Sequence, residues 1–226
     1  MLFFLIGCLL GEAEHSEAKM PVAKIKQFAD NKYKLATNTS VKIVIQDGEN
    51  EVGHGSGNYF KHKGKEFVLT AAHVVSGESE FYILDGNEKV GIKIVFIDFD
   101  TDIAIVVPKR QLKTIKSIKW TQSKNHKIGS KTVYAGWPVH YGKTLLTGFI
   151  SAVRDGGIII HSFALPGSSG SVVFDSSGRV LGVVSSVGLY MGAHSPFPSL
   201  QEDLVYVTTT AYLTSKQLSE VLECGR

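Results

Sequence analysis

A single histidine stands at the end of an apolar segment in the first half of the chain. Residues 67–75 read Phe-Val-Leu-Thr-Ala-Ala-His-Val-Val, so a run typical of a strand ends in two small residues and then presents His73. Imidazole is the only side chain that titrates near neutral pH without help from its surroundings. A group that takes a proton from a hydroxyl and later returns it needs such a pKa and a fixed ring. We predict that His73 is a general base, with a purely structural histidine as the alternative.

An acidic residue stands at the start of a later apolar run. Asp102 immediately precedes Ile-Ala-Ile-Val-Val at 103–107, so its carboxylate is expected to be partly buried at the mouth of a strand. A carboxylate that accepts the Nδ1 proton of an imidazole fixes the tautomer and stabilises the imidazolium formed during reaction. Asp98 and Asp100 compete for this role, but only Asp102 directly abuts the strand. The alternative for each of the three is an ordinary turn residue.

The third candidate lies in a turn crowded with small residues. Residues 165–174 read Leu-Pro-Gly-Ser-Ser-Gly-Ser-Val-Val-Phe. Gly167 can adopt a backbone conformation closed to other residues, which would turn the N–H groups of Gly167 and Ser169 toward one point beside the Ser169 hydroxyl. We therefore predict Ser169 as a nucleophile and the Gly167 and Ser169 amides as its oxyanion hole. A glycine- and serine-rich turn without chemistry is the alternative.

Short β-rich runs, separated by turn residues, must carry these three side chains. Six runs are predicted in the first half and six in the second, at 41–45, 57–60, 66–69, 80–84, 90–97, 103–107, 132–135, 144–153, 157–160, 171–174, 180–186 and 204–208. Regularly spaced short strands of this kind are typical of β-sandwiches and β-barrels. Apolar spacing also predicts one short helix over 21–36 and a final helix over 211–222.

The order His, Asp, Ser in two strand-rich halves resembles the chymotrypsin-like serine peptidases. The motifs that carry the resemblance lie at 70–73, 102–104 and 167–170, with further matches at 55–57, 136–138, 147–151 and 182–185. In motif the chain is most similar to bacterial HtrA-like and glutamyl-endopeptidase-like members, although it ends too early for the PDZ domain usual in HtrA-like proteins. The resemblance implies an all-β fold of two six-stranded antiparallel β-barrels with the triad between them. It also implies a serine endopeptidase that works through an acyl-enzyme and needs no cofactor.

This resemblance, with the strand pattern, divides the chain into four parts. Residues 1–18 are expected to be a signal or anchor segment and residues 19–36 a helical lead-in. Residues 37–112 would form the first barrel with His73 and Asp102. Residues 113–226 would form a connector, the second barrel with Ser169, and the C-terminal helix.

Residues on both sides of the nucleophile are expected to bind substrate, because the family's specificity pocket lies there. Phe163 stands where trypsin-like members keep an acid, and Val184 where glutamyl endopeptidases carry a histidine, so neither charge preference is supported. Val187 aligns with the valine that narrows the pocket of elastase-like members, which implies a preference for small or medium apolar side chains. Ser185 matches the serine that supports the catalytic acid. The predicted substrate-binding residues are Phe163, Leu165, Ser185, Ser186 and Val187.

Composition and histidine spacing argue against other classes. The formal net charge is +3, and the lysine-rich stretch 109–131 has little aromatic interleaving, so we expect a protein or peptide substrate and no nucleic acid. Eight histidines occur without His-Glu-x-x-His or another paired spacing, so a metallohydrolase is the weakest rival and no metal is expected. His161 and His194 flank the specificity segment, where a lone loop histidine is more often solvated than a substrate contact.

The first ten residues form an apolar run that is too short to span a bilayer and fits a signal peptide without its positive charges. Leu-Ile-Gly-Cys at 5–8 also resembles a lipoprotein box, and a buried helix is a third reading. We expect export to the periplasm or medium, or lipid anchoring, and a cytoplasmic protein if this segment is no signal. Membrane contact is expected only if the segment is retained or Cys8 is lipidated. The oligomeric state stays open.

Two rival functions remain within the same fold. A catalytically idle homologue would bind a partner through the cleft, although all three polar roles are filled. A dedicated maturation peptidase would make one cut, including in its own chain, and would spare unrelated proteins.

Overall fold

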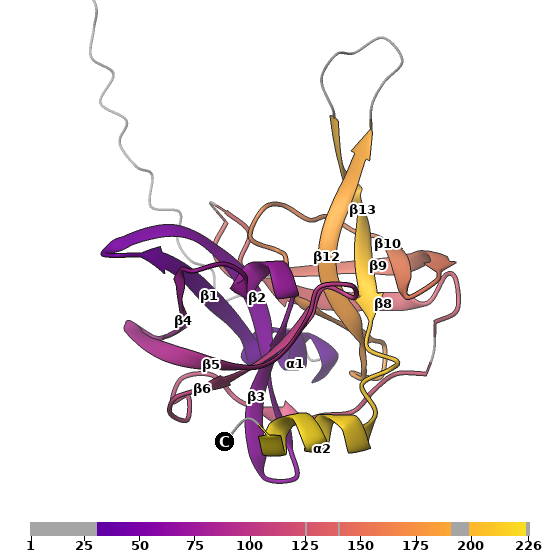
Figure 1. Cartoon of the computed structure of the whole chain (residues 1–226). Helices are drawn as coiled ribbons and strands as arrows, with labels where there is room; N and C mark the ends of the chain where they lie inside the picture. Colours follow the sequence, from indigo (N-terminus) through magenta and orange to yellow (C-terminus); the bar gives the residue numbers. More distant parts are fainter. Residues whose placement is uncertain (1–30, 125, 140, 191–198, 225–226) are drawn as a thin grey trace, which may run out of the picture.

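Six strands of the first half close into an antiparallel barrel in the computed structural model (Figure 1). The structure describes residues 31–124, 126–139, 141–190 and 199–224. The barrel runs in the order β1-β4-β5-β6-β3-β2 and closes through pairing of β1 with β2. Its strands are β1 (Ser40–Asp47), β2 (Asn50–His62), β3 (Lys65–Thr70), β4 (Glu80–Asp85), β5 (Glu88–Asp98) and β6 (Ile103–Pro108).

Six strands of the second half form another closed antiparallel barrel, in the order β10-β13-β12-β11-β8-β9. They are β8 (Lys131–Gly136), β9 (Thr144–Arg154), β10 (Gly157–His161), β11 (Val172–Asp175), β12 (Val180–Tyr190) and β13 (Ser199–Thr209). The prediction of two six-stranded antiparallel barrels is therefore confirmed. The paired β12 and β13 extend well past their predicted ends and run out beyond the second barrel (Figure 1).

Aromatic side chains join the two barrels. Phe60 on β2 stacks on Phe67 of β3 at a centroid distance of 5.7 Å and meets Phe174 of the second barrel at 6.2 Å. Trp120, in the connector, packs edge-on against Phe60 at 5.2 Å. Because these rings are all buried, one apolar cluster reaches from the interior of the first barrel into the interface. The second barrel has its own separate core around Tyr134 and Ile150.

Glycines explain why β2 is much longer than the run predicted at 57–60. A side chain at Gly55 would place its Cβ 2.5 Å from a methyl group of Val74, and one at Gly57 would lie 2.7 Å from Val68. Glycine lowers the strand propensity of residues 50–57, yet only glycine permits this close packing. The two-residue strand β7 (Ile118–Lys119), which pairs parallel to β2, was also not predicted.

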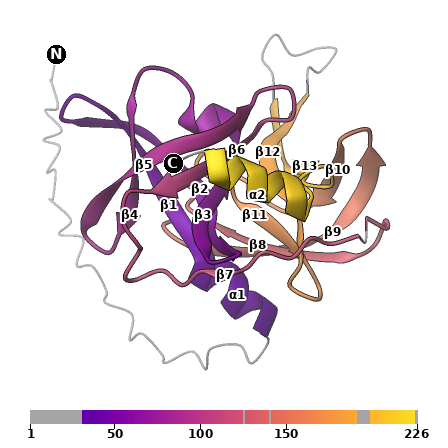
Figure 2. The same cartoon turned by 60° about the horizontal axis from the view of Figure 1, so that its bottom comes forward.

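Two helices flank the barrels. The helix α1 (Asn31–Thr39) includes the last six residues of the segment predicted at 21–36 and continues three residues beyond it, and residues 21–30 lie outside the described part of the chain. The C-terminal α2 (Ser215–Cys224) begins four residues later than predicted and lies over the first barrel (Figure 2). There Lys65 Nζ donates to Leu222 O at 3.0 Å. In the described residues no helix is long and apolar enough to cross a membrane, and the predicted signal segment 1–18 is not described.

Candidate active site

His73 lies where β3 ends at the barrel edge. It is in the one-turn helix η1 (Ala72–Val75), between buried alanine and valine side chains that hold the turn against the core. Its own side chain is 47% exposed. The ring Nδ1 lies 2.9 Å and 3.0 Å from the two carboxylate oxygens of Asp102. Because a carboxylate only accepts, Nδ1 carries the proton, and neutral His73 keeps its lone pair on Nε2.

Asp102 is fixed from three sides. The backbone N–H of His73 donates to Oδ1 at 3.0 Å, and the hydroxyl of Ser185 on β12 donates to Oδ2 at 2.5 Å. Asp102 itself has a left-handed backbone, with φ +52°, and its carbonyl accepts from the Ala72 amide. Burial alone would raise the pKa of Asp102, but the hydrogen bonds from His73 and Ser185 hold it below its ordinary value. The carboxylate therefore stays charged beside the imidazole.

Among the described residues, Asp98 and Asp100, the competitors for this role, make no hydrogen bond to His73. Asp98 accepts from the Asp100 amide at 3.0 Å and from the Thr101 hydroxyl at 2.8 Å, as a turn residue does. Asp98 therefore fits the alternative prediction of an ordinary turn residue, whereas Asp102 contacts His73.

Two backbone amides of the turn before β11 have no hydrogen-bond acceptor within the described part of the chain. Gly167 has φ +92°, as the proposed conformation requires. The carbonyl of Pro166 accepts from Val139 N at 2.9 Å, and that of Ser168 accepts from Ser171 N at 3.1 Å. In a trans peptide the N–H points opposite to the carbonyl, so these two bonds direct the Gly167 and Ser169 amides to the other side. Among the described residues, neither amide donates a hydrogen bond.

Ser56 on β2 clamps this turn, a role that sequence reasoning missed. Its N–H donates to Ser169 O at 2.8 Å, and its hydroxyl donates to Gly167 O at 2.7 Å. The same hydroxyl accepts from Trp137 N at 2.8 Å. Ser56 is fully buried, so all of these bonds are shielded from water. Residues 55–57 were identified as a Gly-Ser-Gly motif of the family. The only sequence feature that could have indicated the role of Ser56 is its position as a small polar residue between two glycines.

The strand β12 connects the turn of Ser169 to Asp102. The Gly170 amide donates to Val184 O at 2.8 Å, and the next residue on that strand, Ser185, holds Asp102. On the other side, a Cβ on Gly170 would lie 2.3 Å from the Thr70 hydroxyl, three residues before His73. Within the described residues the half-buried Ser169 makes no hydrogen bond to His73. Such bonds are often long in free enzymes and tighten when substrate binds.

The predicted substrate-binding residues gather only in part. Ser185 and Ser186 line a cavity of about 400 Å³ together with Asp100, Thr101 and Tyr206. Phe163, Leu165 and Val187 do not line it, and the Phe163 side chain is 44% exposed. Outside this set, His161 is solvent-exposed and stacks on Phe149, and His194 lies outside the described residues.

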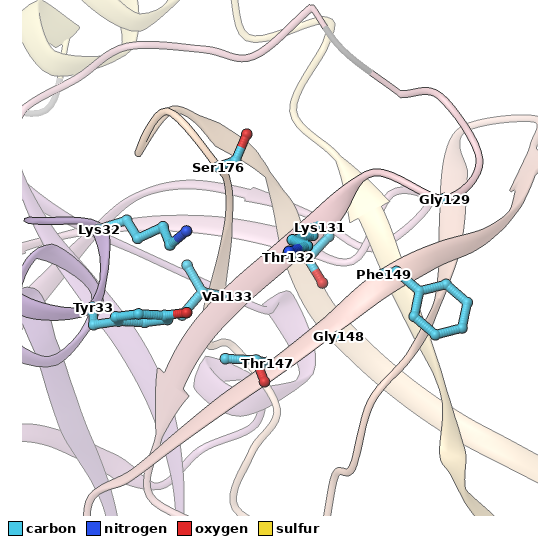
Figure 3. A pocket seen from close by; sticks show the side chains of 10 residues that line it. All are labelled: Lys32, Tyr33, Gly129, Lys131, Thr132, Val133, Thr147, Gly148, Phe149 and Ser176. Carbon is cyan, nitrogen blue, oxygen red and sulfur yellow. The ribbon is translucent and has the colours of Figure 1, made fainter. Parts of the chain in front are cut away.

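A second cavity, of about 450 Å³, lies between α1 and the outer face of β8 and β9 (Figure 3). Lys32, Tyr33 and Thr147 line it, and it holds none of the predicted catalytic or substrate-binding residues. The described ranges also contain no cluster of three or more His, Cys, Asp or Glu side chains placed to hold a metal ion. Neither this cavity nor a metal-binding cluster within the described ranges therefore offers an alternative to the site predicted around His73, Asp102 and Ser169.

Comparison with known proteins assigns the family. Residues 55–183 match the sequence model of the trypsin-like peptidase domain, and the chain belongs to this family. It is similar to the serine protease HtrA-like of Staphylococcus epidermidis, with 26% identity over 77% of this chain and 33% of that protein. It is also similar to protease Do-like 1, chloroplastic, of Arabidopsis thaliana, with 30% identity over 77% of this chain and 43% of the relative. The resemblance to HtrA-like proteins is confirmed.

Solved structures agree on the fold. The active form of the Rv3671c protease from M. tuberculosis superposes with a TM-score of 0.66 at 21% identity, covering 85% of this chain and 84% of that one. The serine endoprotease from Yersinia pestis gives a TM-score of 0.68 at 21% identity, covering 86% and 66%. The chain spans about a third of the length of the first curated relatives that it matches.

Proposed function

We propose that this chain is a serine endopeptidase that hydrolyses peptide bonds through an acyl-enzyme intermediate. The observation that carries the proposal is the run of hydrogen bonds from Ser185 through Asp102 to His73 Nδ1, together with a turn in which two amides have no acceptor among the described residues. Family membership supports the same reaction class. The roles are nucleophile for Ser169, general base for His73 and orienting acid for Asp102.

The reaction begins when the Nε2 lone pair of His73 takes the Ser169 hydroxyl proton as Oγ attacks the scissile carbonyl carbon. The carbonyl π electrons move to the oxygen, and the Gly167 and Ser169 amides donate to the oxyanion that forms. Asp102 remains ionised and stabilises the imidazolium. The oxyanion then collapses, the C–N bond breaks, and the departing amine takes the proton from Nε2.

Water completes the cycle by the same route in reverse. His73 takes a proton from a water molecule as the water oxygen attacks the carbonyl carbon of the acyl ester. The second oxyanion accepts hydrogen bonds from the same two amides. Collapse expels Ser169 Oγ, which recovers its proton from the imidazolium. Every step uses groups of this chain and water, so the proposal requires no cofactor.

The proposed substrates are proteins or peptides with a small or medium apolar residue before the scissile bond. This preference rests on Val187, which lies half-buried on β12 two residues after Ser185. Neither Phe163 nor Val184 offers a charge that would select a basic or acidic side chain.

Export is part of the proposal. A similar protein of Brucella suis is named as a probable periplasmic serine endoprotease DegP-like, at 29% identity over 62% of this chain and 28% of that protein. Fusion of residues 1–30 to a reporter that is active only outside the cytoplasm tests this, and a silent fusion would argue for a cytoplasmic protein.

Unfolded casein separates the proposed function from its rivals. We expect wild-type protein to yield many peptides, Ser169→Ala to yield none, and the exposed-serine control Ser176→Ala to behave as wild type. Cleavage sites identified by mass spectrometry also give the residue preference. Intact casein with one discrete cut in this chain would indicate a maturation peptidase. No cleavage of any kind would indicate an idle homologue.

A further inference from the structure

A second histidine lies against the predicted oxyanion turn. His54 is on β2, two residues before Ser56, and its side chain is only 17% exposed. Its Nε2 lies 2.8 Å from the carbonyl oxygen of Trp137, which is 83 residues away in sequence. A Cβ built on Gly167 would lie 2.5 Å from this carbonyl oxygen and 2.8 Å from His54 Nε2. The hydrogen bond therefore packs directly against Gly167.

The chemistry of this bond fixes what His54 can do. A carbonyl oxygen only accepts, so Nε2 of His54 is protonated and donates whether the ring is neutral or charged. With that nitrogen occupied, His54 cannot replace His73 as the base. Its Nδ1 faces Glu51 Oε1 at 3.8 Å, beyond hydrogen-bond range, and the same oxygen accepts from Lys42 at 2.7 Å. His54 therefore acts as a hydrogen-bond donor to the backbone of Trp137.

The carbonyl that His54 holds belongs to the turn that directs the Gly167 amide. Trp137 N donates to Ser56, and Val139 N donates to Pro166 O. The Trp137 carbonyl stands between these two anchored amides. From outside, the Lys143 ammonium lies 5.1 Å from the centre of the Trp137 ring and donates to Thr37 O. Ser56 binds only the N–H of Trp137, so loss of the hydrogen bond from His54 would leave the Trp137 carbonyl without that donor.

We propose that His54 is a positioning residue for the oxyanion hole. By donating to Trp137 O it holds residues 137–139 where the Val139 amide fixes the Pro166 carbonyl, and that carbonyl sets the direction of the Gly167 N–H. This inference rests on the proposed peptidase function. It predicts that losing the Nε2 donor weakens stabilisation of the transition state and leaves ground-state binding of substrate nearly unchanged.

Three substitutions at His54 separate this role from a merely structural one. His54→Gln places an N–H donor four bonds from Cα, as Nε2 of histidine is. His54→Asn places its donor one bond closer to Cα, and His54→Phe keeps a ring without a donor. We expect kcat of His54→Phe and His54→Asn to fall about tenfold with KM changed less than about twofold. We expect His54→Gln to retain kcat within about twofold of wild type, with an unchanged pH profile.

The measurement is steady-state hydrolysis of the best peptide from casein profiling, with active sites counted by a fluorophosphonate. Counting active sites removes partial unfolding from kcat, and His161→Phe on the exposed face of β10 is the matched control. His54→Asn repeats the comparison should His54→Phe not fold. A wild-type kcat in His54→Phe and His54→Asn would overturn the inference and leave the proposed function intact. The same holds if kcat of His54→Gln falls as much as that of His54→Phe. An inactive, unlabelled wild type would instead defeat the proposed function itself.

Discussion

Ser185 and Asp102 lie 83 residues apart and in different barrels, yet the Ser185 hydroxyl donates a 2.5 Å hydrogen bond to Asp102 Oδ2. The first barrel carries His73 and Asp102, while the second half of the chain carries Ser185 and Ser169, the proposed nucleophile. Because this hydrogen bond helps to lower the pKa of Asp102, the ionisation of Asp102 depends on how the two barrels pack together. Ser185 therefore couples the packing of the barrels to the proposed chemistry.

Removal of this link should weaken catalysis without unfolding the chain. In Ser185→Ala the Asp102 carboxylate loses one of the hydrogen bonds that lower its pKa, so His73 is held less firmly. We expect kcat to fall about tenfold, in keeping with one hydrogen bond to a charged group. Ser185→Thr keeps a hydroxyl and should recover most of the rate. Equal activity in Ser185→Ala and wild type would show that the bond has no role in the reaction.

The oxyanion turn should not tolerate a side chain at Gly167. In Gly167→Ala the new Cβ would meet Trp137 O at 2.5 Å, so the turn must shift and the Gly167 amide with it. We expect kcat to fall by about a hundredfold or more, as when an oxyanion donor is removed. Gly77 has nearly the same φ, +95° against +92°, with open space around it. Gly77→Ala therefore introduces the backbone strain without a steric clash and should leave kcat unchanged. A similar decrease of kcat in both variants would show that the clash with Trp137 is not the cause.

The residue preference should follow the size of the side chain at position 187. Val187→Gly enlarges the proposed pocket by an isopropyl group, so cleavage after phenylalanine, tyrosine and leucine should rise relative to cleavage after alanine and valine. Profiling of cleavage sites in a digest of unfolded protein measures the shift. An unchanged profile would place the specificity pocket elsewhere, and the Ser186 cavity would be the next candidate.

Acid sensitivity should depend on Asp85, a buried carboxylate at the end of β4. Burial alone would raise the pKa of Asp85, but hydrogen bonds from Thr114, Lys113 N and Arg110 hold it well below its ordinary value. A lowered folded-state pKa contributes stability that is present above the ordinary carboxyl value of ~3.9 and is lost as pH falls through the folded-state pKa.

Asp85→Asn should therefore lower the free energy of unfolding by about 2–4 kcal/mol at pH 7, because the Arg110 guanidinium and the neutral donors of Lys113 and Thr114 lose a charged acceptor. The difference from wild type should hold down to pH ~4 and shrink below it. Urea denaturation at several pH values measures this, with the exposed Asp47→Asn as the control. A difference that grows toward low pH would contradict the assignment.

Much of the fold could be predicted because most strands have a local sequence pattern. Apolar runs such as 103–107, which lies between Asp102 and Pro108, are bounded by turn-forming residues, and those boundaries predict most of the barrel strands within a few residues. The strand β7 could not be found in this way, since its two residues are paired to β2 by the tertiary structure alone. Residues 50–56 were missed because their glycines serve packing at the expense of strand propensity.

The predicted site shows the same division. His73, Asp102 and Ser169 stand in short motifs whose order along the chain indicates their chemistry. Ser56 and His54 act through backbone groups of residues more than 80 positions away, so no local pattern marks them. Their roles become visible only when the turn they hold is placed against them.

The most direct test of the account is the site and rate of fluorophosphonate labelling in wild type and in His73→Ala. The account predicts one adduct per chain, located on Ser169 by peptide mapping, and labelling at least about a hundredfold slower in His73→Ala because the base is gone. An adduct on another residue, or an equal labelling rate in the two proteins, would contradict the proposal that His73 activates Ser169.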